Sequence, residues 1–419
     1  MFTTLFIVAL VAMVVTKFWL ALRQMRHVAV RRNAVPDEFS SSITLSAHQT
    51  AADYTIAQTK LALGEIAVGA AVLAVLTLGG GLQWLATAIS RHLGQDYPAQ
   101  IATVGAVIAV ISLADLPFDY VRQFVIEARF GFNRMTLALF FADLAKGVLL
   151  GVALGLPLLW AVLWLMRETG QNWWWMAWLV WVGYSLLILV LYPSLIAPLF
   201  NKFKPLEDDI LRARVEALLK RCGFAAKGLF VMDGSRRSAH GNAYFTGFGA
   251  TKRIVFFDTL LSRLDGREIE AVLAHELGHF KHRHMLKRLV TSFALSLAML
   301  ALLGWLARCP WFYSSLGVTS VTPGAGTGDA LALILFFLVL PVFLFFANPL
   351  KSLSSRKHEF EADAFAAHQT DARDLISALV KLYQDNAATL TPDPLYTAFY
   401  YSHPPAAQRI ERLQALRAA

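Results

Sequence analysis

The stretch AVLAHELGHFKH, Ala271–His282, is the part of the sequence that decides the fold. It contains the pattern H-E-x-x-H, formed by His275, Glu276 and His279. On a helix, two histidines four residues apart lie on one face, where both imidazoles can bind one Zn²⁺. Glu276 would then lie beside the ion, where a carboxylate can take a proton from water. The pattern therefore predicts a zinc site with Glu276 as its general base.

The residues around this pattern favour a helix. Asp265 and Glu268 have the spacing of a capping box, which marks a helix N-terminus. An apolar stripe at helical spacing follows, formed by Ile269, Val272, Leu273 and Leu277. The alternative is a helix with two core or surface histidines that bind no metal. Buried histidines that flank a glutamate are costly without a partner, and this favours the metal site.

The composition is that of an integral membrane protein. Of the 419 residues, 57% are hydrophobic and only 16% are charged, whereas soluble domains carry about 25% charged residues. The two cysteines, Cys222 and Cys309, provide neither a disulfide framework nor a cysteine-rich zinc site. The net charge is +9, with Arg and Lys clustered beside apolar runs. This arrangement suits a lipid bilayer better than nucleic acid, so no nucleic-acid partner is expected.

Seven apolar stretches are long enough, or nearly so, to cross a bilayer about 30 Å thick as helices. They are residues 2–22, 66–90, 97–116, 147–166, 173–196, 289–307 and 330–350. The first lacks the features of a cleavable signal peptide, so we expect it to be retained as a span. Asp115, Pro117 and Asp119 crowd the end of the third and make it the weakest of the seven. We expect a mostly α, polytopic membrane protein.

The charges in the loops predict the orientation of the chain. Basic residues follow the odd-numbered spans: Arg23, Arg26, Arg31, Arg32, Arg122, Arg129, Arg134, Lys202, Lys204, Lys351, Arg356 and Lys357. The opposite loops carry few, namely Arg91, Arg167 and Arg308. The positive-inside rule then puts the N-terminus outside and the C-terminus in the cytoplasm.

We expect four parts of the chain: 1–200 with spans one to five, 201–288 with the H-E-x-x-H helix, 289–350 with spans six and seven, and 351–419. The second part resembles a zincin-like catalytic domain. Its expected elements are an amphipathic helix at 206–221, a strand at 228–232, and a hairpin of 243–248 with 253–258 around 249–251. The fourth part is expected to be helical, with breaks at 391–394 and 403–405.

A catalytic zinc site needs a third protein ligand, and SRKHEFEADAFA, residues 355–366, offers one. Glu359 and Asp363 lie on one helical face, where Glu359 would bind the metal and Asp363 would accept the spare N–H of a histidine ligand. Glu361 lies on another face and is the weaker candidate. Two spans separate His279 from Glu359, which returns the chain to its starting side. The alternative for Glu359 is a solvated charge in a basic juxtamembrane helix.

Four separated motifs, HELGH, NAYF–GF, SR–EF–AD and YSHPP, occur in this order. Together they resemble the type I CAAX prenyl endopeptidase family, integral-membrane zinc metallopeptidases of the gluzincin kind. The resemblance covers nearly the whole chain. It implies that the seven helices enclose a water-filled chamber, with the zinc site facing its interior.

The resemblance also implies roles for individual residues. The zinc ligands would be His275, His279 and Glu359, and the general base Glu276. Asp363 would orient a ligand, Arg409 would steady the carboxylates, His403 would lie beside the scissile carbonyl, and Asn242 would contact the substrate backbone. From the residues alone, His403 can equally be a surface histidine before a Pro-Pro turn, and Asn242 an ordinary turn residue.

Two departures from the family pattern are visible. Glu361 stands where members commonly have Gln, which adds a charge near the site. The chain also lacks the long insertions and retention signal of eukaryotic members, so we expect a bacterial inner-membrane protein. This leaves open whether its substrates are prenylated.

The predicted function is a membrane-embedded zinc endopeptidase with one Zn²⁺ per chain, acting on peptide or protein substrates. It would trim C-terminal CAAX-like tails and short peptides or clear damaged membrane proteins, and the exposed hairpin edge would pair with an extended peptide. The alternatives are a transporter or channel with a structural zinc, and a scaffold with a decayed site. His282 and His284, at the start of span six, are expected to contact lipid headgroups. The sequence does not specify the oligomeric state.

Overall fold

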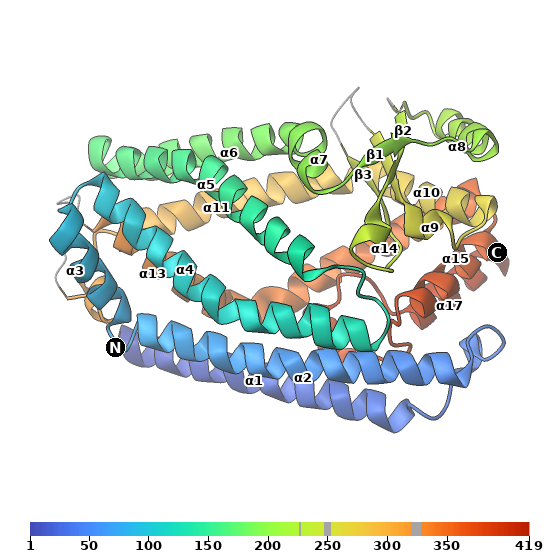
Figure 1. The fold of residues 1–419 in the computed structure, drawn as a ribbon, viewed down its shortest axis with the longest axis horizontal. Helices are drawn as coiled ribbons and strands as arrows, with labels where there is room; N and C mark the ends of the chain where they lie inside the picture. The colour runs from blue at the N-terminus through green and yellow to red at the C-terminus, as the bar shows by residue number, and fades with distance from the viewer. Residues whose placement is uncertain (226–227, 247–252, 320–327, 419) are drawn as a thin grey trace.

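Seven long apolar helices form the membrane part of the computed structural model, which describes residues 1–225, 228–246, 253–319 and 328–418. These helices are α1 (Phe2–Arg31), α2 (Leu45–Leu76), α4 (Tyr97–Val121), α5 (Leu137–Glu168), α6 (Trp173–Leu191), α11 (His284–Leu306) and α13 (Asp329–Leu344). They run along the long axis of the molecule (Figure 1). The prediction of seven spans is confirmed, because each of these helices, α13 together with the helical residues that follow it to Gln369, is long and apolar enough to span a bilayer.

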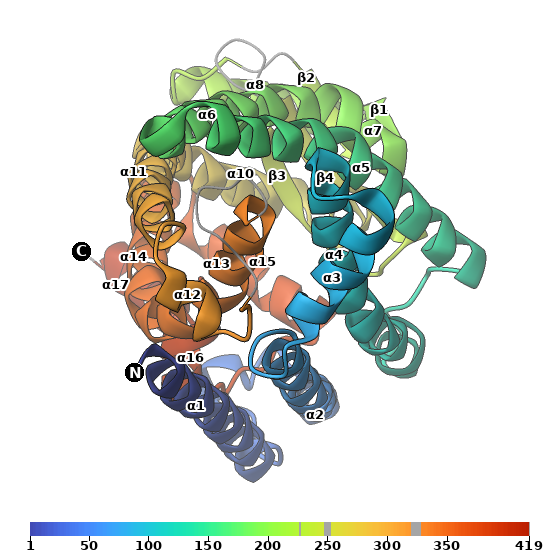
Figure 2. The same cartoon turned by 90° about the vertical axis from the view of Figure 1, so that its left-hand side faces the viewer.

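Viewed along the helices, the spans form a ring (Figure 2). Helices α1 and α2 lie on one side, α6 lies opposite, and α4 and α11 lie between them. Helix α13 lies inside this ring, and 56% of its most apolar window is buried, against 28% or less for the other six spans. The ring therefore surrounds the helix that leads into the second half of the candidate site.

The second span differs from its prediction. A single helix over 66–90 was expected, but α2 ends at Leu76 and a separate α3 (Gly81–Leu93) follows. Gly79, Gly80 and Gly81 lie at the break, and Gly80 has a φ of 71°, in the left-handed region that favours glycine. The apolar pattern of the sequence continues across this turn, whereas the helix does not. The third span continues past Pro117 into a π-helical segment, Arg122–Glu127.

A four-stranded sheet lies at one end of the molecule (Figure 1). Its strands are β1 (Phe203–Pro205), β2 (Gly228–Met232), β3 (Ala243–Thr246) and β4 (Arg253–Phe257), in the order β1-β2-β4-β3. Strand β2 pairs with β4 in parallel, while β1 and β3 pair antiparallel with β2 and β4. The predicted strand and the two hairpin strands are confirmed, although the predicted hairpin turn at 249–251 lies outside the described residues. Strand β3 is at an edge of the sheet.

The H-E-x-x-H helix is α10 (Gly266–Lys281), and it begins with the predicted capping box. The Glu268 N–H donates to Asp265 Oδ1 at 3.0 Å, and the Asp265 N–H donates to Glu268 Oε2 at 2.8 Å. Helix α10 packs against α14 (Asn348–Gln369), α15 (Ala372–Asp385) and α8 (Asp209–Arg221). Their apolar faces form the core of the end of the molecule that carries the sheet, around Val215, Leu218, Leu277 and Leu379.

The remaining helices are short or lie near the C-terminus. They are α7 (Ala197–Phe200), α9 (Asp258–Leu261), α12 (Pro310–Ser314), α16 (Pro394–Tyr400) and α17 (Ala406–Ala418). The predicted breaks at 391–394 and 403–405 lie directly before or at the start of α16 and α17, and are confirmed. Both breaks contain prolines, which lack the N–H that an interior helical position requires.

Candidate active site

Two helices bring together the three predicted metal ligands. Helix α10 carries His275 and His279 one turn apart, and α14 carries Glu359. His275 Nε2 lies 3.5 Å from Glu359 Oε2, and His279 Nε2 lies 3.5 Å from Glu359 Oε1. His275 and Glu359 are buried, while His279 is partly exposed. The two imidazoles thus face one carboxylate from the same side.

The spacing of these three groups fits a zinc ion. Four ligands placed tetrahedrally at bonds of about 2.0–2.1 Å lie about 3.3–3.4 Å from one another. The two N···O separations of 3.5 Å match that distance within a few tenths of an ångström. Two histidines with one carboxylate are also a ligand set of catalytic zinc, which leaves the fourth position to water or substrate.

A buried ion pair orients His275. Asp363 lies one turn after Glu359 on α14, and its Oδ1 is 2.8 Å from His275 Nδ1. Arg409 of α17 donates to both oxygens of Asp363, at 2.8 Å from Nε and 2.6 Å from a terminal nitrogen. All three side chains are buried. An acceptor at Nδ1 holds the ring with Nε2 directed at Glu359, as in the carboxylate–histidine pairs of zinc sites.

The site shifts the pKa values of its residues on α10. Burial acts to lower the pKa of His275, but the hydrogen bonds to Asp363 and Glu359 outweigh it and raise the pKa to about 9. Burial and the neighbouring charge of His275 lower the pKa of His279 to about 3. Burial raises the pKa of the Glu276 carboxyl, as expected of a general base in a confined site. Without metal, the site therefore holds a proton on His275.

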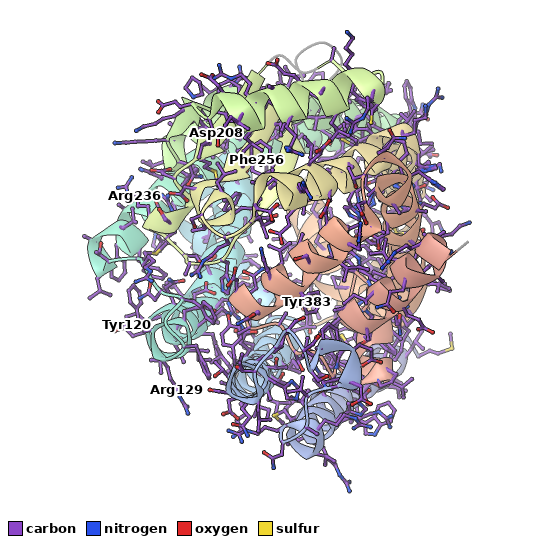
Figure 3. All side chains as sticks on the ribbon, turned by 90° about the vertical axis from the view of Figure 1, so that its right-hand side faces the viewer. Tyr120, Arg129, Asp208, Arg236, Phe256 and Tyr383 are labelled. Carbon is purple, nitrogen blue, oxygen red and sulfur yellow. The ribbon has the colours of Figure 1, made fainter. Side chains whose placement is uncertain are left out.

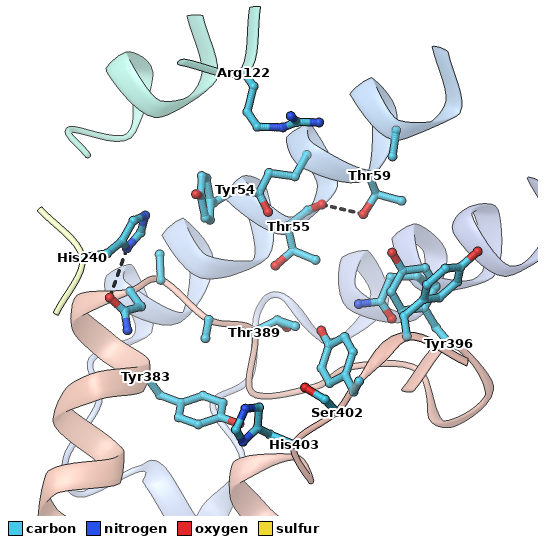
Figure 4. A pocket seen from close by; sticks show the side chains of 18 residues that line it. Tyr54, Thr55, Thr59, Arg122, His240, Tyr383, Thr389, Tyr396, Ser402 and His403 are labelled. Atoms are coloured by element: carbon cyan, nitrogen blue, oxygen red, sulfur yellow. Dashed lines mark hydrogen bonds between the residues drawn. The ribbon is translucent and has the colours of Figure 1, made fainter. Parts of the chain in front are cut away.

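His403 joins the site from the segment between α16 and α17. Its Nδ1 lies 2.7 Å from Glu359 Oε2, while 64% of its side chain is exposed. It lines a cavity of about 680 Å³ (Figure 4). Many of the other lining side chains carry hydroxyl groups, among them Tyr54, Thr55, Thr59, Tyr383, Tyr396 and Ser402. His403 thus contacts both the predicted ligand Glu359 and this polar cavity.

The cavity is lined both by membrane helices and by the end of the molecule that carries the sheet. Tyr383 comes from α15, whereas Tyr54 comes from α2. Figure 3, which views the molecule from the end that carries the sheet, labels Tyr383. His240 lines the same cavity and lies 3.0 Å from Asn386 Oδ1 and 3.3 Å from Glu127 Oε2. The prediction did not include His240, because its partners come from distant parts of the sequence.

Asn242 lies directly before β3 and is exposed. Its carbonyl accepts the N–H of Phe257 at 3.0 Å, and its side-chain oxygen accepts the N–H of Ala243 at 2.8 Å. These contacts fix it at the edge of the sheet, so its expected role toward substrate stays a prediction.

The expectation that His284 contacts lipid headgroups was wrong. His284 is 1% exposed, and its Nδ1 lies 2.9 Å from His279 Nδ1. Its Nε2 lies 2.8 Å from Glu361 Oε2. His284 is five positions after His279, a spacing that does not put two side chains on one helical face, so helical periodicity gave no signal. Glu361 faces His284, apart from the three predicted ligands, as its position on α14 indicated.

Two family models cover almost the whole chain. One, described as the CAAX prenyl protease N-terminal region with five membrane helices, matches residues 24–202. The other, peptidase family M48, matches residues 205–417. The chain belongs to peptidase family M48. This M48 protein is a membrane zinc metallopeptidase, as the resemblance in its sequence implied.

Relatives of this M48 peptidase are similar over most of their length. A CAAX prenyl protease 1 homolog of Arabidopsis thaliana is 38% identical, over 80% of this chain and 79% of the relative. CAAX prenyl protease 1 of Saccharomyces cerevisiae is 35% identical, over 77% and 73%. The crystal structure of S. mikatae Ste24p matches with a TM-score of 0.91 at 29% identity, over 99% of both chains.

These similarities favour the endopeptidase over the transporter, channel and scaffold alternatives. The relatives named here from Arabidopsis and yeast are eukaryotic, so the expected bacterial source stays a prediction.

Proposed function

We propose that this peptidase binds one zinc ion per chain through His275 Nε2, His279 Nε2 and the Glu359 carboxylate. The two 3.5 Å separations between the imidazole nitrogens and the Glu359 oxygens are the observation that carries the proposal. When bound, zinc supplies a Lewis acid for the scissile carbonyl and lowers the pKa of water toward neutrality. The side chains around it must then move the protons and steady the developing charge.

Glu276 is the general base in this proposal. It follows His275 on α10, so it lies beside the ligands without being one of them. Its raised pKa makes it a stronger base than an ordinary glutamate. Glu276 takes a proton from the attacking water and delivers it to the leaving amine, which lets one residue serve both steps.

His403 is the proposed donor to the oxyanion. Glu359 can only accept at Oε2, so His403 Nδ1 must donate there. Donation to the oxyanion from the second ring nitrogen, Nε2, requires that both ring nitrogens carry a proton. A donor directed at a developing oxyanion contributes about 2.7–4 kcal/mol to catalysis.

Asp363 and Arg409 act on His275. Their buried pair fixes the ring so that Nε2 faces Glu359. Removing Arg409 would take two of the three hydrogen bonds of the buried Asp363 carboxylate and leave it with His275 alone, which is destabilising.

The proposed substrates are peptides bound in an extended conformation, foremost C-terminal CAAX-like tails. Among the described residues, strand β3 pairs on one side only, with β4, so its other edge can hydrogen-bond an added strand, and Asn242 lies directly before it. The relatives from Arabidopsis and yeast are named CAAX prenyl proteases, which favours tails of prenylated proteins.

Hydrolysis of quenched peptides by the detergent-purified protein tests this proposal. Glu276→Gln should keep one equivalent of zinc and lose hydrolysis, whereas Glu359→Ala should lose the zinc. A pair of otherwise identical CAAX peptides, one farnesylated, tests the substrate class. Equal kcat/KM for both would overturn the preference for prenylated tails and favour unmodified peptides or damaged membrane proteins.

We also propose that the N-terminus lies outside and the catalytic segments lie in the cytoplasm, in a bacterial inner membrane. The basic residues after the odd-numbered spans support this orientation. In a variant without Cys222 and Cys309, an impermeant thiol reagent applied to intact cells should label Ser314→Cys and not Ser262→Cys. Both serines are exposed. The reverse labelling would overturn the orientation.

A further inference from the structure

A line of three polar side chains leads away from the metal-facing edge of His279. The Nε2 of His279 faces Glu359, and its Nδ1, on the other side of the ring, lies 2.9 Å from His284 Nδ1. The other nitrogen of His284, Nε2, lies 2.8 Å from Glu361 Oε2. His284 is 1% exposed and Glu361 is partly exposed, so the line runs from the buried site toward the surface.

The protons on this line can be assigned once His279 uses Nε2 as a ligand. A neutral histidine that coordinates through Nε2 carries its proton on Nδ1. That proton points at His284 Nδ1, which must therefore accept it. A neutral His284 then has its own proton on Nε2, where the Glu361 carboxylate accepts it. Every donor in the line meets an acceptor, and the last acceptor is an anion.

We propose that His284 and Glu361 are positioning residues for the metal ligand His279. This proposal rests on the proposed function, because it takes His279 as a ligand. The Glu361–His284 pair holds the His279 ring in the orientation that presents Nε2, as the Arg409–Asp363 pair does for His275. Each histidine ligand is thereby hydrogen-bonded, directly or through one further ring, to a carboxylate of α14.

The backbone between the two histidines supports a dedicated arrangement. Helix α10 ends at Lys281 and α11 begins at His284, so only two residues join the two helices. Arg283 makes this turn with a φ of 54°, a left-handed conformation that costs a non-glycine residue about 1–2 kcal/mol. His284 directly follows this residue, and its ring lies against His279. A backbone conformation of this kind persists only where the surrounding contacts hold the residue in it.

His284, His358 and Glu361 also lie close enough to suggest a second cation site, since one atom of each lies within 4.8 Å of the others. The proton assignment argues against it. A cation on His284 Nε2 would move the His284 proton to Nδ1, which faces the protonated Nδ1 of His279, and two donors would meet at 2.9 Å. The rings of His284 and His358 are stacked with centroids 4.0 Å apart, so His358 contributes packing to the line.

Zinc affinity tests the proposal without any need for hydrolysis. Full-length protein carrying Glu276→Gln is stripped of metal in detergent and titrated with zinc against a chelator of known affinity. His284→Ala and Glu361→Ala should each weaken zinc binding by about 10–100-fold. The double variant should lose little more than either single one, since each already breaks the same line. Glu361→Gln keeps an acceptor and should lose less than Glu361→Ala.

Two controls separate this role from general packing. Lys357 lies 4.0 Å from Glu361 and is exposed, so Lys357→Ala should leave zinc binding unchanged. His358→Ala removes only the stacked ring and should keep one equivalent of zinc with nearly normal affinity. In the cobalt-substituted protein, the absorption bands should shift in His284→Ala and not in Lys357→Ala.

Three results would overturn the proposal: binding within threefold of the parent in both single alanine variants, additive losses in the double variant, or a second equivalent of zinc that His358→Ala removes. If His284→Ala does not fold, the comparison of Glu361→Ala with Glu361→Gln decides, with equal affinities counting against it. The proposed ligand set fails separately, when Glu359→Ala retains zinc.

Discussion

The crossing of α10 and α14 at Gly278 leaves no room for a side chain, which predicts a large effect for Gly278→Ala. A Cβ on Gly278 would lie 2.8 Å from Ala362 Cα, 3.0 Å from its carbonyl oxygen and 3.2 Å from its Cβ. Carbon atoms in contact are about 3.5–4.0 Å apart. The two helices would therefore have to separate by about 1 Å at this point.

That displacement acts directly on the site. Helix α14 carries Glu359 three residues before Ala362 and Asp363 directly after it, so both carboxylates move relative to His275 and His279. A misplacement of about 1 Å can cost about 100-fold in rate. Overpacking a core costs about 1–3 kcal/mol in stability. We expect Gly278→Ala to lower kcat/KM about 100-fold, to weaken zinc binding and to lower the Tm.

The assay is hydrolysis of a quenched peptide, with zinc content and thermal unfolding measured on the same preparations. Gly151→Ala is the matched control, because Gly151 is also helical and a Cβ there meets nothing within 4 Å. Adding Ala362→Gly should not rescue Gly278→Ala, since the two nearest atoms belong to the backbone. A Gly278→Ala protein with kcat/KM within threefold of the parent and an unchanged Tm would refute this reasoning.

Three further predictions concern the site. His403→Ala should lower kcat by about 10²–10³ in steady-state assays with KM within a few-fold and zinc retained, and a raised KM at normal kcat would make it a substrate-binding residue. Arg409→Met should cost about 3–5 kcal/mol by denaturant unfolding, because the buried Asp363 loses its guanidinium partner and keeps only His275, and a loss below 1 kcal/mol would contradict that account. Zinc affinity of the metal-stripped protein should rise about tenfold per pH unit below pH 9. In this range zinc must displace the proton of His275, whereas His279 is already neutral. Chelator competition at pH 6.5–8.5 measures this slope, and a flat profile would show that His275 is not protonated.

The sequence was sufficient for those features that depend on local spacing. His275 and His279 share a helical face by their four-residue separation, and Glu359 and Asp363 share another for the same reason. The strand at 228–232 and the capping box at Asp265 were likewise local patterns, and the structure has both. The apolar runs located the spans but not their ends, since α2 begins in the polar sequence at Leu45 and stops at a glycine turn.

The features that were missed depend on a tight backbone turn and on contacts between distant segments. His284 reaches His279 only because Arg283 adopts a left-handed turn, and an arginine there gives no sign of one. The cavity beside His403 is lined from α2, α15 and the segment around α16, and nothing in any one of these stretches indicates the others. Tyr54 and Tyr383 therefore carried no signal as lining residues.

The order of the elements links the assembly of the site to the membrane. His279 and Glu359 are 80 residues apart (359 − 279), and the two spans α11 and α13 lie between them. Closing a flexible loop of that length costs conformational entropy, whereas two helices that cross the bilayer and return bring α10 and α14 to the same side. Leu286, Val290 and Leu295 are exposed on the surface of α11. This apolar surface favours insertion of the helix into lipid over exposure to water. We therefore expect the zinc ligands to meet only once this helical pair is inserted, which would keep the peptidase inactive until it is in the membrane.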